Sequence, residues 1–309
     1  VAIVLILIGA LSKSAIVPLH FWLPGAMAAP TPVSAYLHAA AMVKAGIYLV
    51  ARLAPGFADS GPWRATVITL GLLSMIIAGW RALRAFDLKL VLAFGTVSQL
   101  GFLMVLVGIG TEKAMLAGLT MVLAHAMFKA TLFMVVGIID HTTGTRDIRK
   151  LAHLGKKAPI LAVIAALAAA SMAGLPPFLG FVGKETAFSA VLDTPALAPA
   201  VSALVLTGLV LGSILTVTYS IRFVWGAFGR KHLERPSPAV ASMHAPGALF
   251  LAVPAFLAVL GAVAGVASPV VGRLVEPYTF TVDSYGQAPY HLSLWHGFNL
   301  PLALSAVVV

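Results

Sequence analysis

Apolar segments long enough to cross a lipid bilayer follow one another along almost the whole of this chain. A membrane-spanning helix needs about 20 consecutive, mostly apolar residues. Of the 309 residues, 60% are hydrophobic and 10% are charged, whereas soluble domains carry about 25% charged residues. The sequence therefore predicts an all-α, polytopic membrane helical bundle. The predicted crossings are 1–27, 33–52, 65–81, 89–110, 114–139, 159–192, 198–228, 246–268 and 290–309.

Composition also excludes several classes of function. The chain has no cysteine, which rules out disulfides, thiolate metal sites and cysteine-ligated iron–sulfur clusters. The net charge of +10 comes from basic residues in short loops rather than on amphipathic faces, so no nucleic-acid partner is expected. We find no phosphate-binding glycine loop and no metal-ligand spacing. No cofactor and no metal are therefore predicted.

Both ends of the sequence lie in apolar stretches. The chain opens directly on VAIVLILIGAL, without an initiator Met or a charged signal-peptide head. It stops inside LPLALSAVVV, which is typical of an unfinished helix. We interpret the chain as a fragment of a longer polypeptide.

Two predicted crossings, 1–27 and 159–192, are too long for one straight helix and contain helix breakers at their middles. Each is interpreted as two half-helices joined by unwound backbone. Such backbone survives at membrane depth only where protein or water satisfies its amide groups. Paired broken helices are typical of transporter sites built from inverted repeats. The helix-breaking residues are Pro18 and Pro24 in the first crossing and Gly174, Pro176 and Pro177 in the second.

Basic residues are concentrated in alternate loops, which indicates the orientation of the crossings. Because an excess of Lys and Arg marks cytoplasmic loops, the first broken crossing should run inward and the second outward. The two would then be antiparallel, as an inverted repeat requires. The basic loops carry Arg81, Arg84 and Lys89, then Arg146, Arg149, Lys150, Lys156 and Lys157, then Arg230, Lys231 and Arg235, against Arg52, Arg64, Lys113 and Arg273 in the opposite loops.

Four lysines, Lys13, Lys44, Lys129 and Lys184, lie inside the predicted crossings. A lysine at the bilayer centre costs about 2.5–3.5 kcal/mol even on insertion scales, and such residues usually mark ion or proton routes. Because burial disfavours the charged form, a buried lysine is a candidate carrier that loads and releases a proton. The alternative is a fixed cation that caps a half-helix or pairs with a carboxylate.

Histidines accompany two of these lysines. His38 lies six residues before Lys44, and Tyr48 follows one turn later. His125 and Lys129 are four residues apart and project from one helix face. Histidine titrates near neutrality and suits a proton relay, although a single membrane histidine can instead be a hydrogen-bonded helix contact.

Other polar groups have weaker candidate roles. Ser98 and Gln99 could hold waters between the ionisable side chains or simply satisfy helix contacts. His20 is either structural or an access residue. Glu185 is either the ion partner of the adjacent lysine or its neutralising neighbour, and Asp140 ends the fifth crossing on the cytoplasmic side. The predicted membrane interior is thus rich in lysine and poor in carboxylates.

Three blocks of this sequence carry a resemblance to a known family. They are KSAIVPLHFWLPGAMAAPTPVSAYLHAAAMVKAGIYL, HAMFKATLFMVVG and SMAGLPPFLGFVGKE. In order and spacing the chain resembles the antiporter-like subunits shared by Mrp-type Na⁺/H⁺ antiporters and respiratory complex I. Together with YHLSLWHGFNLPL, they look most like the A-type Mrp subunits. The resemblance covers roughly 1–230 as a proton-translocating core, and 231–309 would be further transmembrane helices leading to a C-terminal membrane extension.

The resemblance implies roles for individual residues. In this family, two broken helices carry central lysines, and the helices between them carry further His and Lys residues, which together form a chain of protonatable sites along the membrane plane. The family also pairs its first central lysine with a glutamate on a helix that would precede Val1. The positions that match are Lys13 and Lys184 on the broken helices, with His38, Lys44, His125 and Lys129 between them.

The resemblance implies a proton-translocating component of a multisubunit Na⁺/H⁺ antiporter, and hence a secondary transporter rather than an enzyme. Its partners would be other subunits, the lipid bilayer, H⁺ and Na⁺, and its location a bacterial plasma membrane. The alternative is an antiporter-like component of complex I or of a membrane-bound hydrogenase, driven by electron transfer. A passive scaffold is a third interpretation, and it predicts that neutralising Lys13 or Lys184 leaves transport intact.

Overall fold

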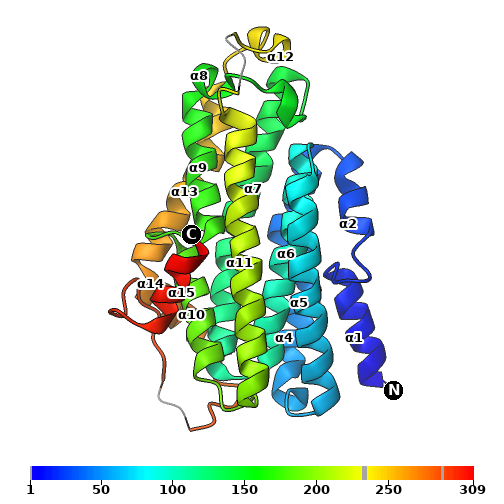
Figure 1. Ribbon diagram of the computed structural model, residues 1–309, viewed down its shortest axis with the longest axis vertical. Helices are drawn as coiled ribbons and strands as arrows, with labels where there is room; N and C mark the ends of the chain where they lie inside the picture. Colours follow the sequence, from blue (N-terminus) through cyan, green and yellow to red (C-terminus); the bar gives the residue numbers. More distant parts are fainter. Residues whose placement is uncertain (1, 232–234, 287–288) are drawn as a thin grey trace.

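The computed structural model describes residues 2–231, 235–286 and 289–309, and the regular structure in these ranges is helical. Long helices run side by side, with loops at the two ends of the bundle (Figure 1). The all-α fold class is confirmed. In chain order the elements are α1 (Ala2–Lys13), α2 (Trp22–Gly25), η1 (Ala26–Ala28), α3 (Thr31–Ala35), η2 (Tyr36–Ala40), α4 (Lys44–Phe57), α5 (Gly61–Arg84), α6 (Leu88–Ile109), α7 (Glu112–Thr143), η3 (Ile148–Lys150), α8 (Leu154–Lys157), α9 (Pro159–Ala173), α10 (Leu179–Leu192), α11 (Pro199–Phe228), α12 (Pro238–Ala241), α13 (Ala248–Val266), α14 (Ser268–Val275), η4 (Glu276–Tyr278) and α15 (Leu300–Val308).

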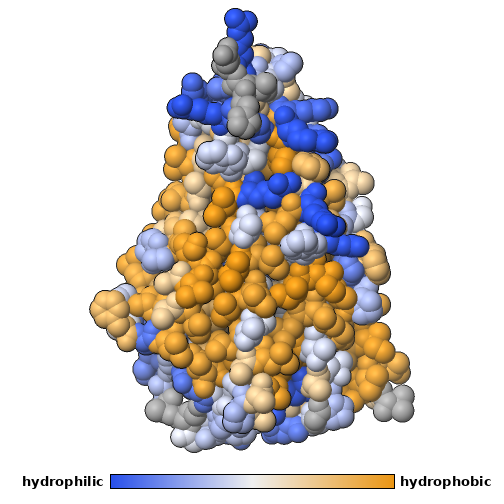
Figure 2. All heavy atoms as spheres, viewed as in Figure 1, coloured by the Kyte–Doolittle hydropathy of each residue, from blue (hydrophilic) through white to orange (hydrophobic). Residues whose placement is uncertain are grey.

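Six helical segments of the described chain are long and apolar enough to cross a membrane: α3 with α4, then α5, α6, α7, α11 and α13. α1 and α9 are apolar but shorter, because each is the first half of a broken crossing. Figure 2 shows apolar surface between two more hydrophilic ends. The α6 helix is buried almost all round, as expected for a helix that is hydrophobic on every face. The chain is thus a multi-pass membrane protein, as predicted.

Both predicted broken crossings are present. α1 ends at Lys13 and the helix resumes with α2 at Trp22, while α9 ends at Ala173 and α10 starts at Leu179. The second break opens at Gly174, whose φ of +82° is the left-handed conformation that glycine commonly supplies after a helix end. Each break therefore separates two half-helices.

The prolines at the breaks divide into two groups. Pro18, Pro176 and Pro177 all lie in the connecting backbone, as predicted. Pro24 does not: it lies inside the short helix α2, so the prediction that it breaks the helix is wrong. The physical reason is its place in the first turn, where a backbone N–H has no intrahelical partner to lose.

A third crossing is also interrupted, which the sequence did not predict. α3 continues into the π-helix η2, and residues 41–43 leave helical geometry before α4 begins at Lys44. No glycine or proline stands in residues 36–43 to signal the interruption. π-helical turns occur often at functional sites, and this one ends four residues before the buried Lys44.

The two broken crossings run in opposite directions, as the distribution of basic residues predicts. In Figure 1, α1 rises towards α2, whereas α9 descends towards α10. The loops around α8 and α12 lie at the upper end, where the surface in Figure 2 is strongly hydrophilic. We refer to this end as the basic side and to the opposite end as the outer side.

The last predicted crossing is shorter than expected. Residues 290–299 form irregular structure, and helix α15 begins at Leu300. Asn299 caps it, because its side-chain oxygen accepts a hydrogen bond from Leu302 N at 2.8 Å. The helix therefore starts at a capping residue that a hydropathy count does not detect. The division of the chain near residue 230 stays a prediction; α13, beyond it, packs against α7 and α9.

Candidate functional site

Three of the four predicted lysines are buried in the bundle. Lys44, Lys129 and Lys184 are 8%, 0% and 2% exposed. Each ammonium group donates a hydrogen bond to a backbone carbonyl. Lys184 Nζ lies 2.5 Å from the Ala173 oxygen, Lys129 Nζ lies 3.1 Å from the Leu92 oxygen, and Lys44 bonds the Ala39 oxygen.

No carboxylate neutralises these three lysines within the described residues, since none of the ion pairs there includes them. Glu185 follows Lys184 directly but does not pair with it, because adjacent positions of a helix point in different directions. Glu185 instead lies next to His296 and Asn299. The prediction of a membrane interior rich in lysine and poor in carboxylates is therefore confirmed for this part of the chain.

The two predicted histidines lie among these lysines. His125 is within electrostatic range of Lys44, Lys129 and His38, so the structure brings the two His/Lys pairs into one cluster. His38 packs on the Phe133 ring, with centroids 4.7 Å apart. Both nitrogens of both histidines are buried without a protein partner in the described structure. Buried polar atoms are nearly always satisfied in proteins, so these rings favour an interior that admits water.

A polar network adjoins Lys129 on its α6 side. Gln99 Nε2 donates to Thr216 Oγ1 at 3.1 Å and to the Tyr219 hydroxyl at 3.3 Å. The Lys129 amine and the Tyr219 ring both rest against Gly95 of α6. Thr216 and Tyr219 were not predicted from the sequence, although TVTYS is a run of hydroxyl residues inside an otherwise apolar helix.

Ser98 joins α6 to a further helix. Its hydroxyl donates to the Met75 carbonyl oxygen at 2.8 Å, which joins α6 to α5. Ser98 therefore makes a helix–helix contact and also neighbours the Tyr219 hydroxyl, and its role in holding water stays a prediction.

The fourth predicted lysine, Lys13, is not buried. It is the last residue of α1 and its side chain is exposed. Tyr48 on α4 is 65% exposed and does not join the buried cluster either. Both lie on elements that expose large apolar side chains such as Leu5 and Leu49. The prediction that Lys13 is buried among the described residues is wrong, because no described helix covers this face.

Lys89 was assigned to a cytoplasmic loop, and the structure corrects this. It lies in the first turn of α6, is 1% exposed and donates to the Ala29 oxygen at 2.7 Å. Ala29 follows η1, at the end of the first broken crossing. In the sequence, Lys89 is a lysine next to a long apolar run. The same pattern is found for exposed loop lysines, so the sequence does not reveal that Lys89 is buried.

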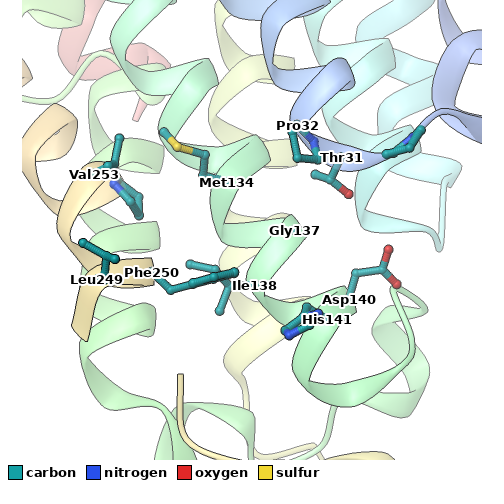
Figure 3. A pocket seen from close by; sticks show the side chains of 12 residues that line it. Thr31, Pro32, Met134, Gly137, Ile138, Asp140, His141, Leu249, Phe250 and Val253 are labelled. Atoms are coloured by element: carbon teal, nitrogen blue, oxygen red, sulfur yellow. The ribbon is translucent and has the colours of Figure 1, made fainter. Parts of the chain in front are cut away.

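His20 and Asp140 occupy the two remaining predicted positions. His20 is 5% exposed, and its ring lies next to the Pro18 backbone in the first break. Asp140 lies at the basic-side end of α7, 3.6 Å from Arg146. It also lines a cavity of about 820 Å³ between α3, α7 and α13, with His141 stacked on Phe250 at its rim (Figure 3). In the described residues no three His, Asp or Glu side chains gather as metal ligands.

Comparison with known proteins places this arrangement in a family. Residues 1–212 match the family described as NADH:quinone oxidoreductase/Mrp antiporter, TM. The A/B subunit of a probable K⁺/H⁺ antiporter from Rhizobium meliloti (strain 1021) is 41% identical over 99% of this chain and 30% of its own length. The A1 subunit of a Na⁺/H⁺ antiporter from Staphylococcus haemolyticus (strain JCSC1435) is 41% identical over 100% of this chain and 40% of its own length.

A solved structure agrees with these matches. One polypeptide of the Mrp complex from Dietzia sp. DQ12-45-1b superposes with a TM-score of 0.88 at 43% identity, over 99% of this chain and 32% of that one. The present chain thus spans 30–40% of the length of the curated relatives it matches. Since the matched residues contain every buried lysine and histidine of the central cluster, the chain belongs to the NADH:quinone oxidoreductase/Mrp antiporter family of membrane subunits.

Proposed function

We propose that this chain is the proton-translocating part of an A-type subunit in a multisubunit bacterial cation/proton antiporter of the plasma membrane. The observation that carries the proposal is the buried cluster of His38, Lys44, His125 and Lys129, which has no carboxylate partner among the described residues. A lysine that a carboxylate does not neutralise can lose its proton without leaving an unpaired buried anion. Such residues suit reversible protonation better than structural ion pairing.

The order of the groups suggests a lateral route. Lys44 and His38 come from the α3–α4 crossing, His125 and Lys129 from α7, and Lys184 from α10. α7 packs against both η2 and α10, so it lies between the other two elements. Protonation of one group would alter the neighbouring charge and thereby favour release from the next. This electrostatic coupling would drive a proton along the membrane plane.

The exchanged cation is proposed from the relatives, whose names include both Na⁺/H⁺ and K⁺/H⁺ antiporters. A hard cation prefers oxygen ligands, and the buried part of this chain offers few acidic ones. We therefore place the cation route at an interface with other subunits. The redox-driven alternative shares the family, but the named relatives given above belong to antiporters.

The test uses everted membrane vesicles that carry the complete complex, with a respiration-generated pH gradient. Adding Na⁺ or K⁺ should dissipate the gradient for the wild type. Lys129→Ala and Lys184→Ala should each lower this response by about a hundredfold or more, as loss of a proton-transfer group does in enzymes. Lys156→Ala, which removes an exposed lysine on α8, is the matched control and should respond as the wild type does.

Two outcomes would contradict the proposal. An undiminished response in both lysine variants, at equal complex abundance, would favour the scaffold interpretation. A wild-type complex that ignores both cations would favour the redox-driven alternative.

A further inference from the structure

The C-terminal segment of this chain brings titratable side chains against the second half of the second broken crossing. α15 packs against α10 and lies beside it in Figure 1. The irregular residues 289–299 precede α15, and Tyr290 among them contacts Lys113 at the start of α7. This segment lies outside residues 1–212, the part that matches the family, so the shared domain does not account for it.

Glu185 is the carboxylate of α10 that faces this segment. It is 2% exposed, and its Oε2 atom has no hydrogen-bond partner in the described structure. Its polar neighbours are His296 and the side chain of Asn299. The Asn299 oxygen already accepts from Leu302 N, which leaves its NH₂ group free to donate to the carboxylate. A buried carboxylate normally finds such partners.

His296 is held in one tautomer. Its Nε2 lies 3.1 Å from the His291 carbonyl oxygen, and a carbonyl can only accept, so Nε2 carries the hydrogen. In the neutral ring Nδ1 is then the acceptor. That atom is buried and has no partner among the described residues. The ring therefore presents an unused proton acceptor beside a carboxylate that has an unused oxygen.

Neighbouring groups hold the pair in place. The Tyr290 ring stacks on His296 with centroids 5.0 Å apart. Burial raises the pKa of Tyr290 to about 12, so its phenol keeps its proton and positions the imidazole rather than exchanging with it. The other titratable groups here include Lys113, 4.3 Å from the Tyr290 ring, and Asp193, which pairs with Lys113 at 2.5 Å. His291 and Glu276 also lie here, with His291 Nδ1 3.3 Å from Glu276 Oε1.

We propose that Glu185 and His296 form a proton-exchange site that connects Lys184 with the outer surface of the membrane. This inference rests on the proposed function. Lys184 and Glu185 are consecutive in α10, so their Cα atoms are about 3.8 Å apart, although their side chains point in different directions. A proton moves between the Glu185 carboxylate and His296 Nδ1 through intervening water, in either direction. O–H and N–H bonds are the only ones that form or break.

The test uses right-side-out vesicles that carry the complete complex and are loaded with Na⁺, so that the bath faces the outer side. The rate of Na⁺ efflux is measured against bath pH at fixed internal pH, and then against internal pH at fixed bath pH. His296→Gln and Glu185→Gln should each lower the rate by about tenfold or more. They should also shift the bath-pH profile and leave the internal-pH profile unchanged. Thr281→Val, at an exposed residue without a titratable group, is the control and should keep both wild-type profiles.

The other possible outcomes show which of the two proposals is wrong. If His296→Gln and Glu185→Gln match the wild type while Lys184→Ala is inactive, the outer site is wrong and the proposed function stands. If Lys184→Ala also matches the wild type, the proposed function itself fails. A lower rate with an unchanged bath-pH profile would make His296 structural and overturn the inference. Complex abundance is matched by native gel electrophoresis, and Glu185→Gln, which keeps the side-chain shape, tests the site if His296→Gln fails to assemble.

Discussion

The buried lysines of this chain rest on backbone carbonyls, and two of these carbonyls are at the ends of half-helices. Lys184 bonds the last residue of α9, and Lys44 bonds the Ala39 oxygen at the end of η2. The C-terminal end of a helix carries a partial negative charge, which stabilises a nearby cation. This charge is smaller than that of a carboxylate. The two alternatives for the lysines, helix cap and proton carrier, are therefore compatible.

The polar network beside Lys129 predicts that removing the Tyr219 hydroxyl lowers proton flux only in part. Tyr219→Phe removes the hydroxyl that contacts Gln99 and Thr216. Loss of one neutral hydrogen bond costs about 0.5–1.5 kcal/mol, so cation-dependent proton flux should fall several-fold without being abolished. Tyr278→Phe, at a 66% exposed tyrosine on the outer side, is the control. An unchanged flux in Tyr219→Phe would show that the hydroxyl does not serve the lysine.

The broken helices depend on neighbours that approach their unwound backbone closely. A Cβ added to Gly265 of α13 would lie 2.0 Å from the Pro177 oxygen, in the second break. Glycine is needed there because no side chain fits between the two backbones. α13 therefore supports the break that precedes Lys184.

This close approach gives a prediction for two glycines of the same helix. Gly265→Ala should overpack the contact and cost about 1–3 kcal/mol, seen as a lower unfolding temperature of the purified complex. Gly261→Ala is the matched control, because the nearest atom to its added Cβ is the Ser171 Oγ at 4.0 Å. Alanine is also the better helix former, so this control should be neutral or slightly stabilising. Equal unfolding temperatures for the two variants would contradict the packing argument.

On the whole molecule, the exposed surface of the first broken crossing combines apolar side chains with a cation. Leu5 is 63% exposed, Phe21 is 68% exposed, and Lys13 lies between them in the chain. Lipid would accept the apolar residues but would make the ammonium group costly. We expect another polypeptide segment to cover this face in the assembled complex. The greater length of the curated relatives agrees with that expectation.

Thiol labelling tests whether another segment covers Lys13. Because the chain has no cysteine, it contributes no labelling other than that of the introduced cysteine. Lys13→Cys in the intact complex should react slowly with a lipid-soluble thiol reagent. Leu211→Cys, at a 51% exposed position of α11, should react quickly, and both should react in denaturant. Comparable rates at the two positions before denaturation would place Lys13 in contact with lipid and contradict the proposal.

Crossings, orientation and candidate residues were predictable because they depend on local features of the sequence. Runs of apolar residues must be buried or meet lipid, basic loops set the orientation, and prolines with glycines mark breaks. The lysines stood out because a cation within such a run is costly wherever it lies. The resemblance then assigned roles to individual residues, and these roles stay predictions.

Only the tertiary structure shows the contacts between residues that are far apart in the chain. Glu185 turns to His296 instead of Lys184 because α15 returns to α10. Tyr219 reaches Gln99 because α11 lies against α6. The interruption before Lys44 has no proline or glycine to mark it. Such contacts arise from three-dimensional packing between distant segments, which residue type and spacing along the chain do not encode locally.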